Sequence, residues 1–391
     1  MQNFQFHIST AVTFGKDTHH KVGEIVKSYG FSKIMLHYGC GSIQKNGIYD
    51  AVMKSLSDAG IEVIDFGGVE PNPKLSFVEK GVKLCKETGV ELILAVGGGS
   101  VIDSAKEIAI GAKYDGSTWD FTSGRKQPTE TLPVGVVLTL AASGSEMSTS
   151  AVITNEENGV KRGYNTQLHR PLFAICNPEL TYTVDKFQTG CGIVDIMMHT
   201  LERYFSKSPE TPLTDALAEA LLRQVVAAGT KAILDPEDYE ARADLMWASS
   251  LSHNDLTGCG RNVFLTCHQL EHELSGKYDF VAHGAGLSII FPAWAEYVYQ
   301  HNLDRFIQYA TQVWDVPDDY DDPADIAIQG IVATKAFFRE IGMPTKLSQL
   351  GIGEEAFEEM AEKCTNYGTR VLPGDLPLGK QEIIDIFRLA L

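Results

Sequence analysis

Long hydrophobic runs, paired cysteines and basic residues are all scarce in this 391-residue sequence. A membrane-spanning helix needs roughly 18 or more apolar residues. The run at residues 132–143 is shorter than this and is interrupted by glycine. The first residues lack the basic and apolar regions of a secretory signal. We therefore expect a cytoplasmic protein with no membrane partner.

The shortage of basic residues also restricts the partners. Lys and Arg number 33 against 51 Asp and Glu, which gives a net charge of −18. Such a chain repels phosphate backbones, so we expect no nucleic-acid partner. The seven cysteines are dispersed and form no C-x-x-C pair, a distribution typical of reduced thiols rather than of a disulfide framework.

Apolar patterns divide the chain into two parts. Short apolar runs that alternate with helical stretches indicate strands near residues 33–38, 61–66, 92–96 and 132–140. Strands of this kind form a parallel sheet that helices cover on both faces. After about residue 183, long stretches have helical periodicity instead. We expect an α/β Rossmann-like dinucleotide-binding domain at residues 1–182 and an all-α domain at residues 183–391.

A glycine-rich turn follows the third expected strand. Gly97, Gly98, Gly99 and Ser100 stand between that strand and a helix. Exposed N–H groups at a helix N-terminus favour an anion, and glycines let a pyrophosphate approach the backbone. The spacing is neither G-x-G-x-x-G nor a P-loop. The alternative is a turn that only connects strand and helix, but we predict phosphate binding.

A second loop, Gly39-Cys40-Gly41-Ser42, follows the first expected strand. An NAD-specific site places a carboxylate at such a position to bind the ribose hydroxyls, and a carboxylate would repel a 2′-phosphate. Only small residues occur here, and Lys45 follows them. The loop therefore favours NADP(H), with an ordinary strand-to-helix turn as the alternative.

Histidines and acids recur at helical spacing in the second half. Asp195 and His199 are four residues apart, and Glu202 follows on the same helix face. His268 and His272 are again four apart. Each pair alone could be a set of satisfied core histidines or a solvated face. Two such pairs on apolar helices favour a metal site.

A further histidine, His283, begins another expected helix. Carboxylate and imidazole ligands suit Fe²⁺, Zn²⁺, Mn²⁺ or Co²⁺, and the ligand types do not choose among them. A mixed Cys/His zinc site is an alternative because Cys191, Cys259 and Cys267 lie near the histidines in the sequence. However, Cys267 points about 100° away from His268 on a helix, which indicates a packing role.

In combination these motifs resemble the iron-containing (group III) alcohol dehydrogenase family, and within it the NADPH-dependent butanol dehydrogenase-type enzymes. The resemblance covers nearly the whole chain. It rests on motifs at residues 71–73, 97–103, 139–147, 177–181, 192–202 and 268–284. It implies the dehydroquinate synthase-like fold, in which an α/β cofactor domain precedes a helical metal-binding domain. It also implies a homodimer.

Site residues follow from the resemblance position by position. The implied metal ligands are Asp195, His199, His268 and His283, with Fe²⁺ as the first choice and Zn²⁺ as the alternative. His272 matches a residue beside the metal, either as a catalytic proton relay or as a residue that orients a ligand. Together with the glycine turn, the implied cofactor-binding residues are Gly39, Ser42, Gly97, Gly98, Gly99, Ser100, Asp103, Thr139, Ser143, Ser145 and Lys161.

The function implied is metal-dependent hydride transfer between NADP(H) and a small aliphatic primary alcohol or aldehyde. One alternative is a dehydroquinate synthase-like lyase, which would need a cluster of basic residues for its substrate. The other alternative is a non-catalytic nucleotide-binding regulator with a structural metal.

Overall fold

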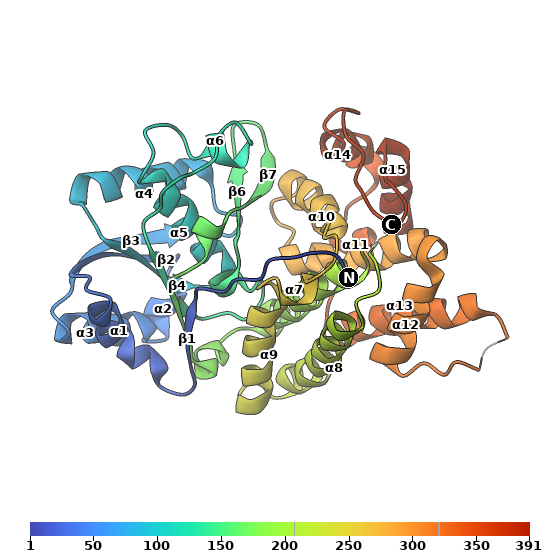
Figure 1. Cartoon of the computed structure of the whole chain (residues 1–391), viewed down its shortest axis with the longest axis horizontal. Coiled ribbons are helices and arrows are strands. Elements are labelled where there is room, and N and C mark those ends of the chain that lie inside the picture. The colour runs from blue at the N-terminus through green and yellow to red at the C-terminus, as the bar shows by residue number, and fades with distance from the viewer. Residues whose placement is uncertain (207, 320) are drawn as a thin grey trace. The chain divides into compact units, whose positions relative to one another are not determined.

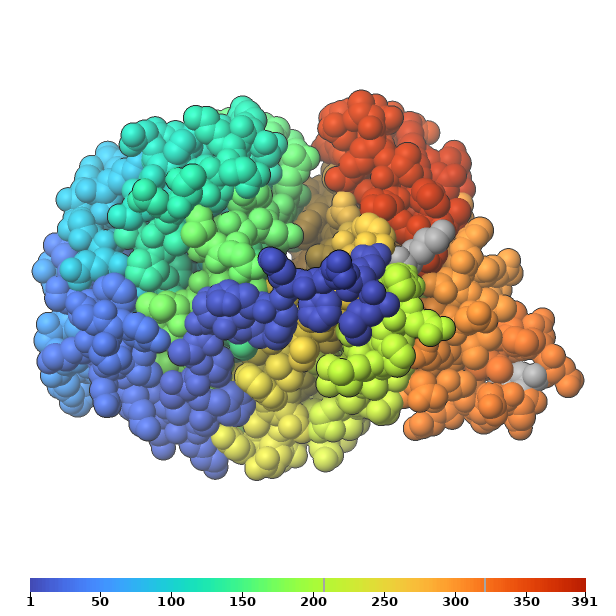
Figure 2. Space-filling view, in the orientation of Figure 1, coloured from blue at the N-terminus to red at the C-terminus, as the bar shows by residue number. Residues whose placement is uncertain are grey.

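The computed structural model describes residues 1–206, 208–319 and 321–391. This described chain divides into two compact units. An α/β unit contains residues 7–184 and 249–254, and a helical unit contains residues 1–6, 185–248 and 255–391. The expected division at residue 182 lies close to the one at residue 184, but residues 1–6 and 249–254 each lie in the other unit. The Met1 amino group donates to Glu210 O and Gln2 N to Gly260 O, which holds the N-terminus on the helical unit (Figure 2).

Within the described residues, the α/β unit contains a six-stranded sheet in the order β1-β8-β5-β4-β2-β3. Every pair in it is parallel. Its strands are β1 (Ala11–Phe14), β2 (Lys33–Gly39), β3 (Glu62–Val69), β4 (Leu92–Gly97), β5 (Val134–Leu138) and β8 (Phe173–Cys176). Every residue of β4, β5 and β8 is buried, because these strands lie inside the sheet and are covered on both faces.

Helices cover the two faces of this sheet (Figure 1). Helices α1 (Val22–Ser28) and α3 (Ile48–Asp58) pack together on one face, and α4 (Leu75–Thr88) and α5 (Gly99–Gly111) on the other. Shorter helices α2 (Ser42–Lys45) and α6 (Trp119–Thr122) follow β2 and α5. An antiparallel hairpin of β6 (Ser150–Asn155) and β7 (Val160–Asn165) lies outside the sheet.

The helical unit contains two almost fully buried helices, and its other helices pack around them. Its elements are α7 (Lys186–Tyr204), α8 (Pro212–Leu234), α9 (Tyr239–Ser252), α10 (Thr266–Lys277), α11 (His283–Val298), α12 (Leu303–Trp314), α13 (Pro323–Glu340), α14 (Phe357–Cys364) and α15 (Lys380–Leu389). Helices α7 and α11 are buried along most of their length and pack against each other in the core. Among the described residues, no helix is both long enough and apolar enough to cross a bilayer.

Candidate functional site

Three helices of the helical unit bring the predicted metal ligands together. Asp195 and His199 lie one turn apart on α7, His268 lies near the start of α10, and His283 begins α11. Asp195 Oδ1 is 3.1 Å from His199 Nδ1 and 3.6 Å from His268 Nε2. The same oxygen is 3.8 Å from His283 Nε2. Three histidines therefore converge on one carboxylate oxygen, although the sequence positions of the four residues span 88.

The donor atoms at this point fit a divalent cation. Among the described residues, the buried atoms Asp195 Oδ1 and His268 Nε2 have no hydrogen-bond partner. A buried polar atom without a partner costs about 1–3 kcal/mol. A cation bound by both atoms removes that cost, and a set of one carboxylate and several imidazoles suits first-row divalent metals.

Two glutamates orient the imidazoles from behind. Glu202 accepts hydrogen bonds from His268 Nδ1 and from the backbone N–H groups of Cys267 and His268. Glu271 accepts a hydrogen bond from His283 Nδ1. A proton held on Nδ1 leaves Nε2 as the ligand atom, which is the usual arrangement behind metal-bound histidines. Sequence reasoning placed Glu202 beside the metal without making it a ligand, but it missed Glu271, whose only signal is its position one turn after His268.

Burial and mutual charge set the protonation of the cluster. Burial opposes ionisation of Asp195, but the adjacent His199, His268 and His283 outweigh it and hold the pKa of the carboxyl well below its usual range. Burial also lowers the pKa of His199, to about 4. For His268 the effect of burial is overcome by Glu202 and Asp195, which raise its pKa to about 9. Without a metal, both ring nitrogens of His268 are therefore protonated at neutral pH.

His272 lies at the edge of this cluster. It follows His268 by one turn of α10 and is partly exposed. Its ring centroid is 5.6 Å from that of His283 and 6.4 Å from that of His268. Glu271, His272 and His283 also offer three ligand atoms within 4.8 Å of one another. By the same criterion Asp195, His199 and His268 form a separate group without His283. The two groups meet where His283 Nε2 lies 3.8 Å from Asp195 Oδ1.

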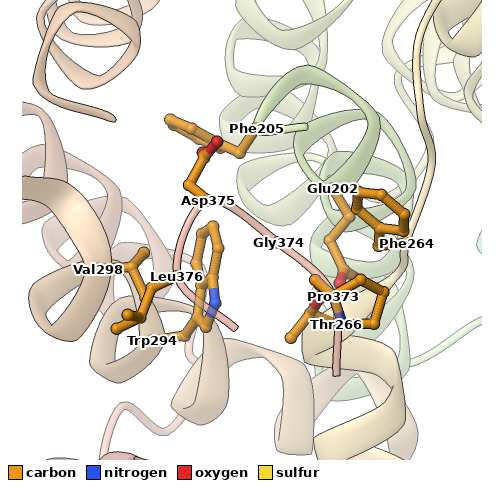
Figure 3. A pocket seen from close by; sticks show the side chains of 10 residues that line it. All are labelled: Glu202, Phe205, Phe264, Thr266, Trp294, Val298, Pro373, Gly374, Asp375 and Leu376. Carbon is orange, nitrogen blue, oxygen red and sulfur yellow. Dashed lines mark hydrogen bonds between the residues drawn. The ribbon is translucent and has the colours of Figure 1, made fainter. Parts of the chain in front are cut away.

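A pocket of the helical unit reaches Glu202 from another side (Figure 3). Its walls are mainly apolar: Phe264 lies near Glu202 at one end, and Trp294 and Leu376 form the other. The oxygens of Glu202 already accept hydrogen bonds from His268 and Cys267. The pocket therefore borders Glu202, which supports the predicted ligand His268, and not the ligand atoms. We place no reacting group in this pocket.

The predicted phosphate turn lies in the α/β unit, where β4 ends at Gly97 and α5 begins at Gly99. The first N–H groups of α5 have no partner within the helix, and such groups bind anions. A Cβ on Gly98 would come within 3.0 Å of Leu140 Cβ, and one on Gly99 within 2.5 Å of Ser143 Oγ. Leu140 and Ser143 thus lie directly against the turn and leave little room for a side chain there.

The other residues expected around this turn have different environments. Thr139 N donates to Gly97 O at 3.1 Å. Asp103 accepts hydrogen bonds from Ser145 Oγ at 2.6 Å and from Val152 N at 2.9 Å. Asp103 and Ser145 therefore already bind within the protein and link α5 to the following segment, whereas the Ser143 hydroxyl faces Gly99.

Lys106, which sequence reasoning missed, completes this link. Its fully buried ammonium group donates to Ser145 Oγ at 2.8 Å, Ser150 O at 2.7 Å and both oxygens of Ser148. Burial lowers the pKa of Lys106 to about 8 despite the nearby carboxylates of Asp103 and Glu146. The sequence signal for this role was a lysine within an otherwise largely apolar helix.

The remaining predicted cofactor residues lie at two other places in the α/β unit. Gly39 is the last residue of β2, and Ser42 is the exposed first residue of α2. A Cβ on Gly39 would have its nearest neighbour at 3.4 Å, so a side chain has room there. Lys161 lies on β7 opposite Thr154 in the hairpin.

A parallel α/β unit with a glycine turn at a strand end, joined to a helical unit with a buried Asp–His cluster, is typical of dinucleotide-dependent metalloenzymes. Comparison with known families agrees. The family model for iron-containing alcohol dehydrogenase matches residues 9–178, and the model for the C-terminal part of the same family matches residues 189–391.

Individual relatives cover almost the entire chain. NADH-dependent butanol dehydrogenase A of Clostridium acetobutylicum is 42% identical over 99% of both chains, and NADPH-dependent aldehyde reductase YqhD of Escherichia coli is 35% identical over 94% of both. The crystal structure of NADH-dependent butanol dehydrogenase A from Thermotoga maritima has a TM-score of 0.95 and 38% identity, covering 100% of this chain and 99% of that one.

The chain therefore belongs to the iron-containing alcohol dehydrogenase family. The predictions of the family and of the fold class are confirmed. The protein is an oxidoreductase of alcohols and aldehydes that uses a nicotinamide cofactor and a metal ion.

Proposed function

We propose that this protein reduces small aliphatic aldehydes to primary alcohols with NADP(H), and catalyses the reverse oxidation, at a divalent metal held by Asp195, His199, His268 and His283. The observation that carries the proposal is the convergence of these side chains around two buried atoms that lack partners, Asp195 Oδ1 and His268 Nε2. Fe²⁺ is the ion we propose first, and Zn²⁺ suits the same ligands.

The chemistry divides between the bound groups and the chain. A divalent cation supplies Lewis-acid polarisation of a carbonyl group, and a reduced nicotinamide supplies a hydride. Glu202 and Glu271 keep the Nδ1 protons of His268 and His283 in place, so that both Nε2 atoms remain available as ligands. Asp195 contributes the negative charge, because its pKa is held low.

Reduction of an aldehyde also consumes a proton. The carbonyl carbon accepts the hydride, and the carbonyl oxygen must accept a proton that comes from solvent. We place His272 on the path of that proton because it lies within 6.4 Å of His268, ring centre to ring centre, and is partly exposed. An imidazole titrates near neutral pH and can take up and release a proton there.

The choice between NADPH and NADH depends on the loop after β2. Gly39 and Ser42 present no carboxylate to a 2′-phosphate. The carboxylate of Asp65, on the neighbouring strand β3, accepts hydrogen bonds from Tyr38 and Tyr49. These contacts support NADP(H). Four butanol dehydrogenases that are 38–42% identical to this chain are named NADH-dependent, and an aldehyde reductase that is 35% identical is named NADPH-dependent. The names alone therefore favour NADH, and the proposal of NADP(H) rests on the loop after β2.

One kinetic experiment tests the proposal. The purified protein is assayed with butyraldehyde and either NADPH or NADH, with the Gly39→Asp variant in parallel. We expect a higher kcat/KM with NADPH, and a shift toward NADH in Gly39→Asp because the new carboxylate repels the 2′-phosphate. A wild-type preference for NADH would overturn the cofactor assignment. Tight cofactor binding without any turnover would instead favour the regulatory alternative.

The family resemblance also implies a homodimer. That assembly stays a prediction, and sedimentation of the purified protein measures it directly.

A further inference from the structure

Six residues of the C-terminal half of the chain are part of the α/β unit. Helix α9 begins in the helical unit, but its last turn and the two residues after it, together residues 249–254, belong to the α/β unit. This segment packs against the residues that precede η2 (Ser145–Met147). Those residues are the ones that cover the predicted phosphate turn.

Two side chains of the segment bind three consecutive backbone positions. Ser249 Oγ donates to Ala142 O and accepts from Gly144 N, both at 3.1 Å. His253 Nδ1 donates to Ser143 O at 2.8 Å. Ser249 is fully buried and His253 is nine-tenths buried, so water does not compete effectively for these bonds.

The backbone at this contact is packed too closely to accommodate a side chain at Gly144. Gly144 has a φ of 64° and is buried. A Cβ there would lie 2.4 Å from Ser249 O and 2.8 Å from His253 Cβ. Only glycine permits both the left-handed conformation and this close approach, so the contact fixes residues 142–144 in one position.

Ser143 connects this contact to the predicted cofactor site, because its hydroxyl faces Gly99 at the start of α5. We propose that Ser249 and His253 are positioning residues, which hold the Ser143 hydroxyl beside the glycine turn where it binds the phosphates of a nicotinamide dinucleotide. This inference rests on the cofactor site of the proposed function. It adds to that site a support that the chain supplies more than 100 residues after the loop.

The test compares Ser249→Ala with the matched control Ser252→Ala. Both serines are fully buried near the end of α9, but the Ser252 hydroxyl donates to Ser249 O, not to the loop. Dissociation constants of NADH and NADPH are measured by cofactor fluorescence on metal-free protein. We expect Ser249→Ala to weaken binding of the preferred cofactor about fivefold, as loss of a hydrogen bond does, and Ser252→Ala to stay within twofold of wild type.

His253 provides the second pair. His253→Ala removes the donor to Ser143 O and is expected to weaken cofactor binding, whereas the amide of His253→Asn can donate from nearly the position of Nδ1 and is expected to restore most of it. In steady-state assays, KM for the cofactor should rise while kcat stays near wild type. A purely structural role would lower the melting temperature in Ser249→Ala and Ser252→Ala alike without separating their cofactor affinities.

The outcomes separate the two proposals. Equal cofactor affinity in Ser249→Ala and Ser252→Ala would overturn the positioning role, and so would a wild-type protein that binds neither NADH nor NADPH. If wild type binds the cofactor with the expected variant effects but does not reduce butyraldehyde, the positioning role holds and the proposed reaction fails.

Discussion

Asp195 and His268 show how neighbouring charges decide what a buried side chain can do. The His268 Nδ1 proton is held by Glu202, and its Nε2 lies 3.6 Å from Asp195 Oδ1. Carboxylates on both sides of the ring raise its pKa to about 9, against the opposing effect of burial. Because a metal ligand must be deprotonated at the coordinating atom, a cation has to displace this proton.

Metal affinity is therefore expected to depend on pH. His268 carries its extra proton at every pH below about 9, whereas Asp195 is already ionised and His199 is already neutral. Between pH 6 and pH 8 the apparent affinity for Zn²⁺ should rise about tenfold per pH unit, since one proton leaves on binding. Competition with a chelator of known affinity measures it. An affinity that stays constant across this range would contradict the assigned ionisation.

A second prediction concerns Glu202, which binds the Nδ1 side of the predicted metal ligand His268. Glu202→Gln removes the charge that holds the His268 proton, and we expect metal affinity to fall about 10- to 100-fold. Glu210→Gln, which changes an exposed glutamate of the same unit, is the control. Metal content is measured after dialysis against a weak chelator. Equal retention in the two variants would show that Glu202 does not support the ligand.

At the scale of elements, α5 and the residues around it form the framework of the proposed cofactor site. The helix begins at the glycine turn, and its Asp103, one turn later, and Lys106, two turns later, bind the segment at residues 145–152. The loop at residues 142–144 is held separately, by Ser249 and His253. The turn, the helix and the loop are thus fixed to one another.

Gly99→Ala tests whether this framework serves the cofactor. The added methyl would come within 2.5 Å of Ser143 Oγ and 3.3 Å of Ser143 Cβ, so the Ser143 hydroxyl would have to turn away from the glycine turn. We expect the affinity for NADPH to drop at least tenfold while metal content stays unchanged. Gly163→Ala, whose added methyl meets its nearest atom at 3.4 Å, is the control. Unchanged NADPH binding in Gly99→Ala would remove the turn from the cofactor site.

Sequence patterns predicted the elements that carry strong local signals. Strands β2 to β5 are apolar and are followed by turns, and α7 and α10 place their acids and histidines at helical spacing. Strands β1 and β8 were missed because each has only four residues, too few for periodicity to show. The hairpin of β6 and β7 was also missed. Its turn contains Asn158-Gly159, a pair that favours hairpins, but β7 is mostly polar.

The site itself could be predicted only in part. Spacing indicates that Asp195 and His199 share a helix face, but no local pattern shows that α7, α10 and α11 meet. The role of Glu271 depends on where α11 begins relative to α10. Likewise, nothing near residue 143 in the sequence points to Ser249. Contacts of this kind depend on tertiary packing, which single-sequence patterns do not encode.

At the scale of the whole molecule, buried neutral histidines lower the stability in acid, whereas Glu107, whose pKa burial raises to about 8, acts in the opposite direction. In the α/β unit, burial lowers the pKa of His37 to about 4 and that of His169 to about 3. In the unfolded chain both would titrate near 6.5. Below that pH the unfolded state binds protons that the folded state does not, so acid favours unfolding.

We therefore expect the contribution of His37 to the free energy of unfolding to fall as the pH is lowered from about 6.5 toward 4. Each of these histidines contributes up to about 1.4 kcal/mol per pH unit within that window. Urea titrations of wild type and His37→Asn at pH 7, 6 and 5 measure the slope. The variant should lose less stability than wild type over this range, although it starts lower. Identical slopes would show that His37 is not kept neutral by the fold.

A metal held by Asp195, His199, His268 and His283 is the central requirement that we propose for the reduction of aldehydes. The direct measurement is the oxidation of NADPH by butyraldehyde, followed after complete removal of metal and again after addition of Fe²⁺ or Zn²⁺. Turnover should vanish with the metal and return with it in wild type, and should stay absent in His268→Ala. Full turnover by metal-free protein, or by His268→Ala, would contradict the account.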